Sequence, residues 1–260
     1  MAVISVISAK GSPGATVSTL GLALAWPIVA PGRRALVVDA DPVGGDMGAG
    51  ILRGSVPSAR GMLALGASRE QDSLEMIERH AVELTGDGSV RLLPGIPDSA
   101  RLTALELASE RLRSCRSELS EGGVDLVVDA GRVGTHLGTS PWIEHADRIL
   151  LVLRPTLPSV RAARALLSAW GPHRLTPRAV LVASPSPYGR ADVVRAVASC
   201  PVHEIAFDAR SARVYSDGDT PHRSFARTRF VRSFTALAAD LAEDLAEVLT
   251  PQRSGLTDAP

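Results

Sequence analysis

The chain has 260 residues, of which 45% are apolar and 22% charged, as in an ordinary folded domain. Its 28 basic and 28 acidic residues give a formal net charge of zero, which excludes attraction of the whole molecule to nucleic acid or to an anionic membrane. The two cysteines, Cys115 and Cys200, form no spaced pair, and the six histidines show no metal-binding spacing. We therefore expect buried thiols and no metal site built from cysteine and histidine.

The apolar runs are too short for a membrane span. Ile149 to Leu153, among the longest of them, is far below the roughly 18 to 20 residues that cross a bilayer. The first apolar run is not preceded by the basic segment of a secretory leader. These features predict a cytoplasmic protein.

Short apolar runs alternate with helical stretches along the chain. Ala2 to Ile7 is rich in β-branched residues and predicts a buried strand. The small and apolar residues of Thr16 to Trp26 predict a helix that breaks near Pro27. Further strands are predicted at 35–38, 90–93, 124–128, 149–153 and 179–183, and further helices at 68–84, 99–119, 159–170 and 191–199.

This alternation predicts the α/β class, with a single doubly wound, mainly parallel sheet and helices on both faces. No repeat or long linker divides the chain. We expect one domain over residues 1–250, followed by a flexible tail over residues 251–260, whose composition is typical of turns and disorder.

The turn after the first strand reads AKGSPGAT from Ala9. Gly11 and Gly14 allow backbone N–H groups to surround an anion, and Thr16 opens the helix with a hydroxyl that can bind Mg²⁺. The strict phosphate-loop pattern GxxxxGK[ST] fails at Ala9 and at Ala15. An ordinary strand-to-helix turn uses the same residue types, so the loop alone leaves both interpretations open.

Carboxylates follow two of the predicted strands. Asp39 and Asp41 end the strand LVVD and enter the glycine-containing segment DADPVGGD, and Asp129 ends the strand VDLVVD. Oxygen ligands at neighbouring strand ends, above a phosphate loop, are what Mg²⁺ requires. Each aspartate alone is equally compatible with a helix cap or a loop.

Together these segments resemble the ParA/MinD family of P-loop ATPases, whose deviant phosphate loop reads KGGxGK[ST]. The resemblance extends over nearly the whole chain, from the Lys10 loop through DADPVGGD, VRLLPG, VDLVVDAG and ADRILLVLRPTLPSVRAARALL to IAFDARSARVYSDGDTP. It implies a P-loop ATPase fold, ATP and Mg²⁺ as cofactors, and a homodimer that sandwiches the nucleotides.

The resemblance also implies a role for each matching residue. Lys10, the single lysine of the chain, matches the lysine that reaches the partner's phosphates across the dimer, and with Asp39 and Asp41 it forms the predicted catalytic set. Thr16, Asp39 and Asp129 match the residues that bind or organise Mg²⁺. The predicted nucleotide-binding residues are Gly11, Ser12, Pro13, Gly14, Ala15, Thr16 and Val17 in the loop, with Phe207 and Asp208 beside the base.

Three departures from the family pattern weaken the predicted site. The second loop lysine, which grips the β- and γ-phosphates, is Ala15 here; the second loop glycine is Ser12; and an adenine-reading asparagine is absent from residues 182–184. Losing one charge-assisted contact to phosphate costs about 1.5 to 3 kcal/mol, or roughly 10- to 150-fold in affinity. We expect at most a slow ATPase that converts ATP to ADP and phosphate. Arg132, just past Asp129, is either a replacement charge or a solvated arginine.

A narrower resemblance is to the CpaE/TadZ-like branch of the family, which also has atypical phosphate loops. It implies a switch protein whose nucleotide-linked dimerisation positions or regulates a partner such as Tad-type pilus or secretion machinery. Two alternatives remain open at this point: a pseudo-ATPase scaffold that dimerises without nucleotide, and a ParA-type DNA-partitioning ATPase.

The carboxyl-terminal third separates basic from acidic residues. Six arginines and two aspartates between Ala209 and Arg232 give that stretch a net charge of +4, whereas residues 233–250 carry four acids and no base. The acidic helix argues against direct membrane insertion. The region Arg210–Arg232 is compatible with nonspecific DNA binding, or with a solvated surface that pairs with the acidic helix or a protein partner. Phe225, Phe230 and Phe234 have spacings typical of a helix packed on the core.

Overall fold

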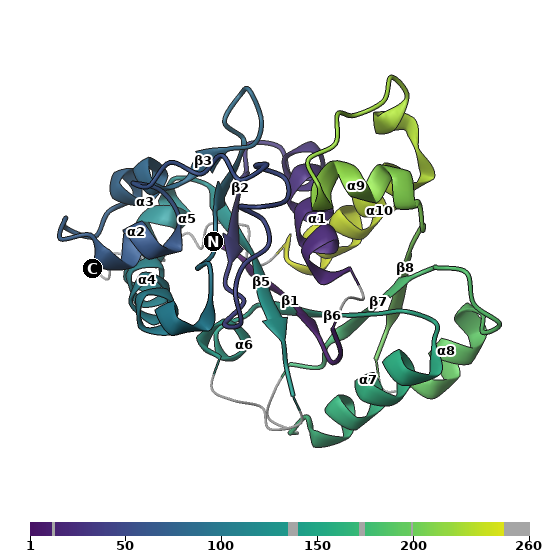
Figure 1. The fold of residues 1–260 in the computed structure, drawn as a ribbon. Helices are drawn as coiled ribbons and strands as arrows, with labels where there is room; N and C mark the ends of the chain where they lie inside the picture. The colour runs from purple at the N-terminus through teal and green to yellow at the C-terminus, as the bar shows by residue number, and fades with distance from the viewer. Residues whose placement is uncertain (12–13, 135–139, 172–174, 199, 247–260) are drawn as a thin grey trace, which may run out of the picture.

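The computed structural model describes residues 1–11, 14–134, 140–171, 175–198 and 200–246. They form one eight-stranded sheet in the order β3-β4-β2-β5-β1-β6-β7-β8, in which every neighbouring pair is parallel except β3 with β4 (Figure 1). The predicted α/β class and mainly parallel sheet are confirmed. The predicted tail over 251–260 lies outside the described residues.

The strands are β1 (Val3–Ser8), β2 (Arg34–Asp39), β3 (Val82–Glu83), β4 (Val90–Leu93), β5 (Val124–Arg132), β6 (Arg148–Leu153), β7 (Arg178–Val182) and β8 (Val202–Ile205). The helices are α1 (Ala15–Val29), α2 (Met62–Ala67), α3 (Leu74–His80), α4 (Leu102–Ser114), α5 (Arg116–Glu121), α6 (Pro141–Glu144), α7 (Leu157–Ala169), α8 (Arg190–Ala196), α9 (Ala209–Ser216) and α10 (Arg229–Asp244). Short 3-10 turns cover η1 (Ser99–Arg101) and η2 (Phe225–Arg227).

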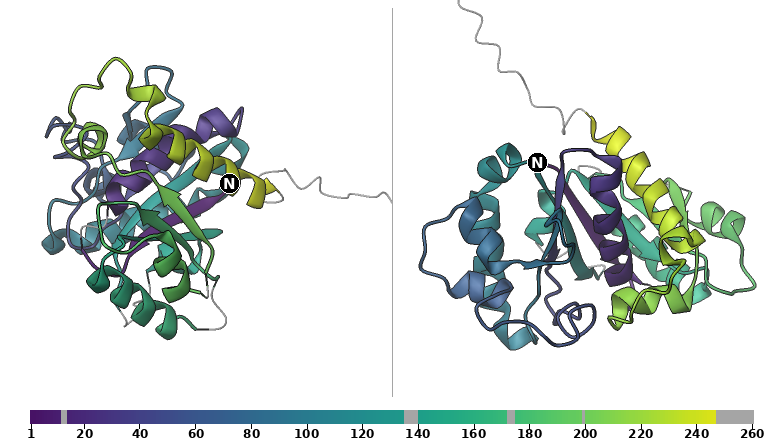
Figure 2. Two further views of the ribbon diagram at one scale, coloured as in Figure 1. Left: turned by 90° about the vertical axis from the view of Figure 1, so that its right-hand side faces the viewer. Right: turned by 90° about the horizontal axis from the view of Figure 1, so that it is seen from above.

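Helices cover both faces of the sheet. On one face α1 and α10 lie side by side, with α9 beside them, as Figure 2 shows from above. The opposite face is covered by the helices α2 to α8. Strand β1 shows the pattern: Ile4 and Val6 pack on the α1 side, while Val3 and Ile7 pack on the other. None of the helices in these described segments combines the length and apolar character needed to cross a bilayer.

Helix α1 passes through Pro27 and ends at Val29, so the predicted break near Pro27 is wrong. The proline stands in the last turn, where the loss of one backbone hydrogen bond is tolerated. The amide of Ala30 still closes on the carbonyl of Trp26 at 2.9 Å.

The helix predicted over 68–84 is also wrong over much of its length. Only Leu74–His80 is helical there, because Ser73 caps that helix by accepting a hydrogen bond from the Met76 amide at 3.1 Å. The residues after it form β3, which pairs antiparallel with β4. The helix predicted over 99–119 divides into η1, α4 and α5, with Cys115 between the two α-helices. Strand β8 and helix α2 were not predicted.

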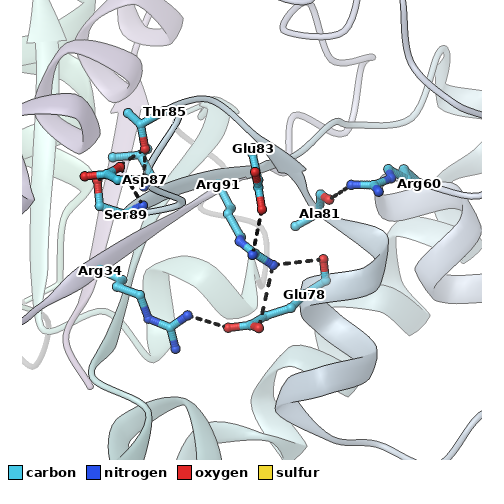
Figure 3. A network of polar contacts seen from close by, with 10 residues as sticks. Arg34, Arg60, Glu78, Ala81, Glu83, Thr85, Asp87, Ser89 and Arg91 are labelled. Atoms are coloured by element: carbon cyan, nitrogen blue, oxygen red, sulfur yellow. Dashed lines mark hydrogen bonds and ion pairs between the residues drawn. The ribbon is translucent and has the colours of Figure 1, made fainter.

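Ion pairs fasten the β3 edge of the sheet (Figure 3). Arg91 Nη2 lies 2.8 Å from Glu83 Oε1 across the β3–β4 pair, and Arg91 Nη1 lies 3.6 Å from Glu78 Oε2 in α3. Glu78 in turn contacts Arg34 of β2 at 2.6 Å. The two-residue edge strand is therefore tied to its neighbours by side chains as well as by its backbone.

A buried charge cluster ties α1 to the amino edge of the sheet. Asp125, at the start of β5, accepts hydrogen bonds from the Trp26 indole at 2.9 Å, from Arg33 Nε at 2.8 Å and from the Ala2 amide at 2.7 Å. Arg33 and Asp125 also form an ion pair. The carboxyl-terminal end of α1 is thus anchored to β5.

Candidate functional site

The predicted site lies at the carboxyl edge of the sheet, where β1 leads into α1. Gly14 caps α1 with φ +100°, a left-handed conformation that favours glycine, and Ala15 is the first helical residue. Lys10 and Gly11 are exposed. Ser12 and Pro13, two predicted nucleotide-binding residues, lie outside the described residues. Val17 follows within the first turn of α1.

Thr16 and Asp129 meet at this edge. The Thr16 hydroxyl forms a hydrogen-bonding interaction with the Asp129 carboxylate, and the Gly131 amide donates to Asp129 Oδ1 at 3.0 Å. Asp129 is nevertheless buried so deeply that its pKa is raised to about 6. The hydroxyl and carboxylate that the sequence assigned to Mg²⁺ therefore lie together.

Asp39 stands beside Asp129, because the two residues are paired in register on β2 and β5. Asp39 is 1% exposed and accepts hydrogen bonds from the amides of Met47, at 3.2 Å, and Gly95. Burial raises the pKa of Asp39 to about 7, and the charge of Asp129 acts in the same direction. Two carboxylates with elevated pKa values thus share one end of the sheet.

Asp41 completes the carboxylate group, and glycines allow the loops to close around it. Asp41 Oδ1 accepts a hydrogen bond from the Val43 amide at 2.9 Å, and burial raises the pKa of Asp41. A Cβ at Gly131, where φ is +70°, would lie 2.5 Å from the Asp41 carboxyl carbon. A Cβ at Gly45 would lie 2.3 Å from Asp39 Oδ2. Neither position tolerates a larger residue without movement.

These carboxylates fit a magnesium-bound nucleotide. Asp39, Asp41 and Asp129 form no ion pair with any residue that the structure describes, whereas Asp125, equally buried on β5, is neutralised by Arg33. A buried carboxylate without a cation is costly. The described segments contain no ready-made group of three or more metal-ligating side chains. Mg²⁺ typically takes only one or two carboxylates and completes its shell with phosphate oxygens and water.

Ala15 leaves the phosphate loop without a cation at its usual position. Its side chain is buried and packs with the α1 side of the core. Lys10 instead lines an open cavity of about 630 Å³ together with the first turns of α7, among them Leu157 and Arg161. That Lys10 reaches a partner's phosphates stays a prediction.

Phe207 and Asp208 lie at the far edge of the sheet, just after β8. Phe207 is 42% exposed. Asp208 caps α9: its carboxylate accepts hydrogen bonds from the amides of Arg210 and Ser211, both at 3.1 Å, and from the Ser211 hydroxyl at 2.6 Å. These bonds, chiefly those from Ser211, lower the pKa of Asp208. Its role beside a nucleotide base stays a prediction, and its capping role is established by the geometry.

Another cavity, of about 380 Å³, touches the same strand ends from the opposite face of the sheet. It is lined largely by apolar side chains of α4 and α6, including Leu105 and Trp142, with Arg132 at the strand end. Arg132 is exposed and contacts this cavity, so it lies on the other side of the strand ends from α1.

Sequence reasoning missed the glycines that shape the carboxylate group. Gly95 follows β4, and its Cβ would lie 2.9 Å from the Asp39 carboxyl carbon. The signal that could have found it was its position: a glycine just beyond a strand that neighbours β2. Reading that signal requires the strand order, which the sequence does not display.

No protein-family model and no curated protein sequence matches the chain. Solved structures do match in fold. A ParA family ATPase from Chlorobium tepidum matches with a TM-score of 0.70 at 19% identity, over 92% of this chain and 98% of that chain. The MinD cell division protein of Aquifex aeolicus matches with a TM-score of 0.69 at 19% identity, over 94% and 98%.

A third match is the septum site-determining protein MinD from Pyrococcus horikoshii, complexed with Mg-ADP, with a TM-score of 0.63 at 19% identity, over 96% of this chain and 99% of that chain. The chain therefore has the fold of the ParA/MinD ATPases, as its sequence predicted. The narrower resemblance to the CpaE/TadZ-like branch stays a prediction.

Proposed function

We propose that this protein is a nucleotide-binding switch that takes up Mg-ATP between the start of α1 and the carboxylates Asp39, Asp41 and Asp129. One observation carries the proposal: Thr16 lies against Asp129, and Asp39 stands beside it in register, all at the start of α1 and with no cation paired to either carboxylate in the described residues. The match to a MinD complexed with Mg-ADP supports the same ligand.

Nucleotide binding is proposed to drive dimerisation through the same edge of the sheet. Large apolar side chains are exposed in the loops that follow β2, β6 and β8: Val43 at 72%, Leu157 at 63% and Phe207 at 42%. Exposed apolar residues grouped around a site are typical of a surface that a partner covers. The dimer in turn would position or regulate a partner, such as Tad-type pilus or secretion machinery, in the cytoplasm. A MinC:MinD complex of Aquifex aeolicus has the same fold in its MinD component and supports a protein partner.

Size-exclusion chromatography with light scattering tests the switch. The unmutated protein is expected to shift from monomer to dimer when Mg-ATP is added, and Lys10→Ala is expected to reduce that shift by about 10-fold or more in ATP concentration. Arg195→Ala, an exposed arginine on α8, serves as the charge control and should dimerise normally. An elution volume that is indifferent to Mg-ATP in the unmutated protein would contradict the proposal.

A second candidate function is a scaffold that dimerises without nucleotide. The observation that favours it is Ala15, buried where a phosphate-binding lysine is expected. The same chromatography separates the two functions, because the scaffold elutes as a dimer before any ATP is added and calorimetry then detects no ATP binding at millimolar concentration.

A further inference from the structure

Arg154 carries a buried charge that has no partner. Its Nε is buried and makes no hydrogen bond, and its guanidinium forms no ion pair with any described residue. Its backbone, by contrast, is satisfied: the amide donates to Ser159 Oγ at 3.0 Å and the carbonyl accepts from Thr156 at 2.8 Å. An arginine side chain is always charged, and leaving one of its N–H groups buried and unpaired is costly.

The other two buried and unpartnered side-chain atoms in the described residues differ from it in charge. Ser18 is neutral, and Arg91 is neutralised through its other nitrogens by Glu83. Native structures leave such atoms unpaired where an ion or ligand belongs. Arg154 is therefore the position, among these three, that calls for an anion.

The sheet places Arg154 at the phosphate loop. Ser8, the last residue of β1, pairs with Val152 of β6, so the two strands end together, and Arg154 follows β6 as Lys10 follows β1. Leu153 pairs with Leu181 of β7, so Arg154 stands level with Val182.

The side of the sheet is defined by the same register. Val152 and its partner Val180 pack on the α1 side, and Val182 packs there too. A Cβ at Gly14 would lie 3.7 Å from Val182 Cγ2, so the start of α1 lies over this strand end. Alternation along β6 puts position 154 on the same side as Val152, which is the side of Gly14 and Ala15.

We propose that Arg154 binds a phosphate group of the nucleotide, and so replaces from the neighbouring strand the cation that Ala15 removes from the loop. This inference rests on the proposed function. A guanidinium binds phosphate oxygens through two parallel N–H groups, which suits a fixed position beside a helix amino end. Arg132, which the sequence offered for this role, contacts the opposite side of the strand ends.

Titration calorimetry with Mg-ATP tests the assignment in four proteins. Arg154→Met keeps the apolar stem, and we expect it to weaken Mg-ATP binding by about 10-fold or more. Arg164→Met, an exposed arginine on α7, is the matched control and should bind as the unmutated protein does. Ala15→Lys combined with Arg154→Met should recover the missing affinity, because it restores a cation from the loop itself.

Thermal denaturation without nucleotide supplies a second measurement. Removing an unpaired buried N–H should leave the melting temperature of Arg154→Met unchanged or raised, whereas an arginine that only holds the fold together would lower it. A lowered melting temperature, unchanged Mg-ATP affinity, or weakened affinity that Ala15→Lys fails to recover would each overturn the role of Arg154. If neither the unmutated protein nor Ala15→Lys binds Mg-ATP at about 5 mM, the proposed function itself fails and this assignment with it.

Discussion

Two buried aspartates on the same strand have opposite surroundings. Asp125 is paired with Arg33 and held by an indole and an amide, so it contributes to the fold as an ion pair. Asp129 lies at the other end of β5, in contact with Thr16 and beside Asp39, and no described cation pairs with it. Because burying an unpaired carboxylate destabilises a protein, the Asp39 and Asp129 pair is a place where stability is reduced in favour of ligand binding.

Asp39→Asn is therefore expected to stabilise the protein in magnesium-free buffer. The pKa of Asp39 is raised to about 7, while an unfolded aspartate titrates near 4. The stability that its proton contributes is fully present below about pH 4 and is lost as the pH rises through about 7. The variant should be more stable than the unmutated protein at pH 8, by on the order of a few kcal/mol, and nearly equal to it at pH 4.

Urea denaturation at several pH values, in the presence of EDTA, measures this difference. Glu243→Gln, at an exposed carboxylate of α10, is the control for removing a negative charge. Equal pH dependence in Asp39→Asn and the unmutated protein would show that Asp39 is not strained in the way its burial indicates.

At the scale of elements, α1 and α10 form a pair that depends on one glycine. Gly21 faces Phe234, and a Cβ on Gly21 would lie 2.5 Å from the Phe234 ring. Phe230 and Phe234 are buried in α10, as their spacing predicted, while Phe225 is only partly buried in η2. The prediction of a helix packed on the core is confirmed for the first two of these residues.

Gly21→Ala is expected to destabilise the fold. The added methyl must displace a buried ring, at a cost of about 1 to 3 kcal/mol, which exceeds the roughly 1 kcal/mol that alanine gains over glycine inside a helix. Thermal denaturation checks the sign, and adding Phe234→Leu should recover part of the stability. A melting temperature that rises in Gly21→Ala would mean that the two helices separate easily.

The acidic part of α10 pairs with strands and not with the arginine-rich stretch, so that expectation was wrong. Asp244 lies 3.9 Å from Arg148 Nε and also pairs with Arg178, while Asp240 lies 3.1 Å from His203. The reason is geometric: α10 begins at Arg229, and its acids stand in the later turns, about 1.5 Å per residue further along the axis.

The sequence predicted the features that depend on local pattern and strand order. Thr16, Asp39 and Asp129 were assigned to one site because parallel strands bring their carboxyl ends to one edge. It could not predict the pairing of Trp26 with Asp125, which joins residues 99 positions apart. Nor could it predict β3, whose two residues take their conformation from β4.

At the scale of the whole molecule, a net charge of zero conceals an uneven surface. Arg213 pairs with Asp217 and Asp219, at 3.5 and 3.1 Å. The other five arginines of the 209–232 stretch are exposed and form no ion pair within the described residues: Arg210, Arg223, Arg227, Arg229 and Arg232. This surface is the observation that keeps the DNA-partitioning alternative open.

That alternative makes a quantitative prediction. Binding to nonspecific duplex DNA should fall steeply with salt, and Arg227→Ala with Arg229→Ala should reduce the slope of log affinity against log salt by about 0.9 for each DNA phosphate that the protein no longer neutralises. Fluorescence anisotropy measures the slope, with Arg195→Ala as the control. A molecule that shows no ATP-stimulated DNA binding at low salt excludes the DNA-partitioning alternative.

The clamp of Trp26 and Arg33 on Asp125 fixes one end of α1, and the phosphate loop lies at the other. A helix of 15 residues is about 22 Å long, so it works as a lever with its pivot at the amino edge of the sheet. A ligand that tilts it by about 5° moves its free end by roughly 2 Å. Since Phe234 is wedged against Gly21 midway along, α10 moves with the same lever, and its outer face is where an event at the phosphates would be transmitted.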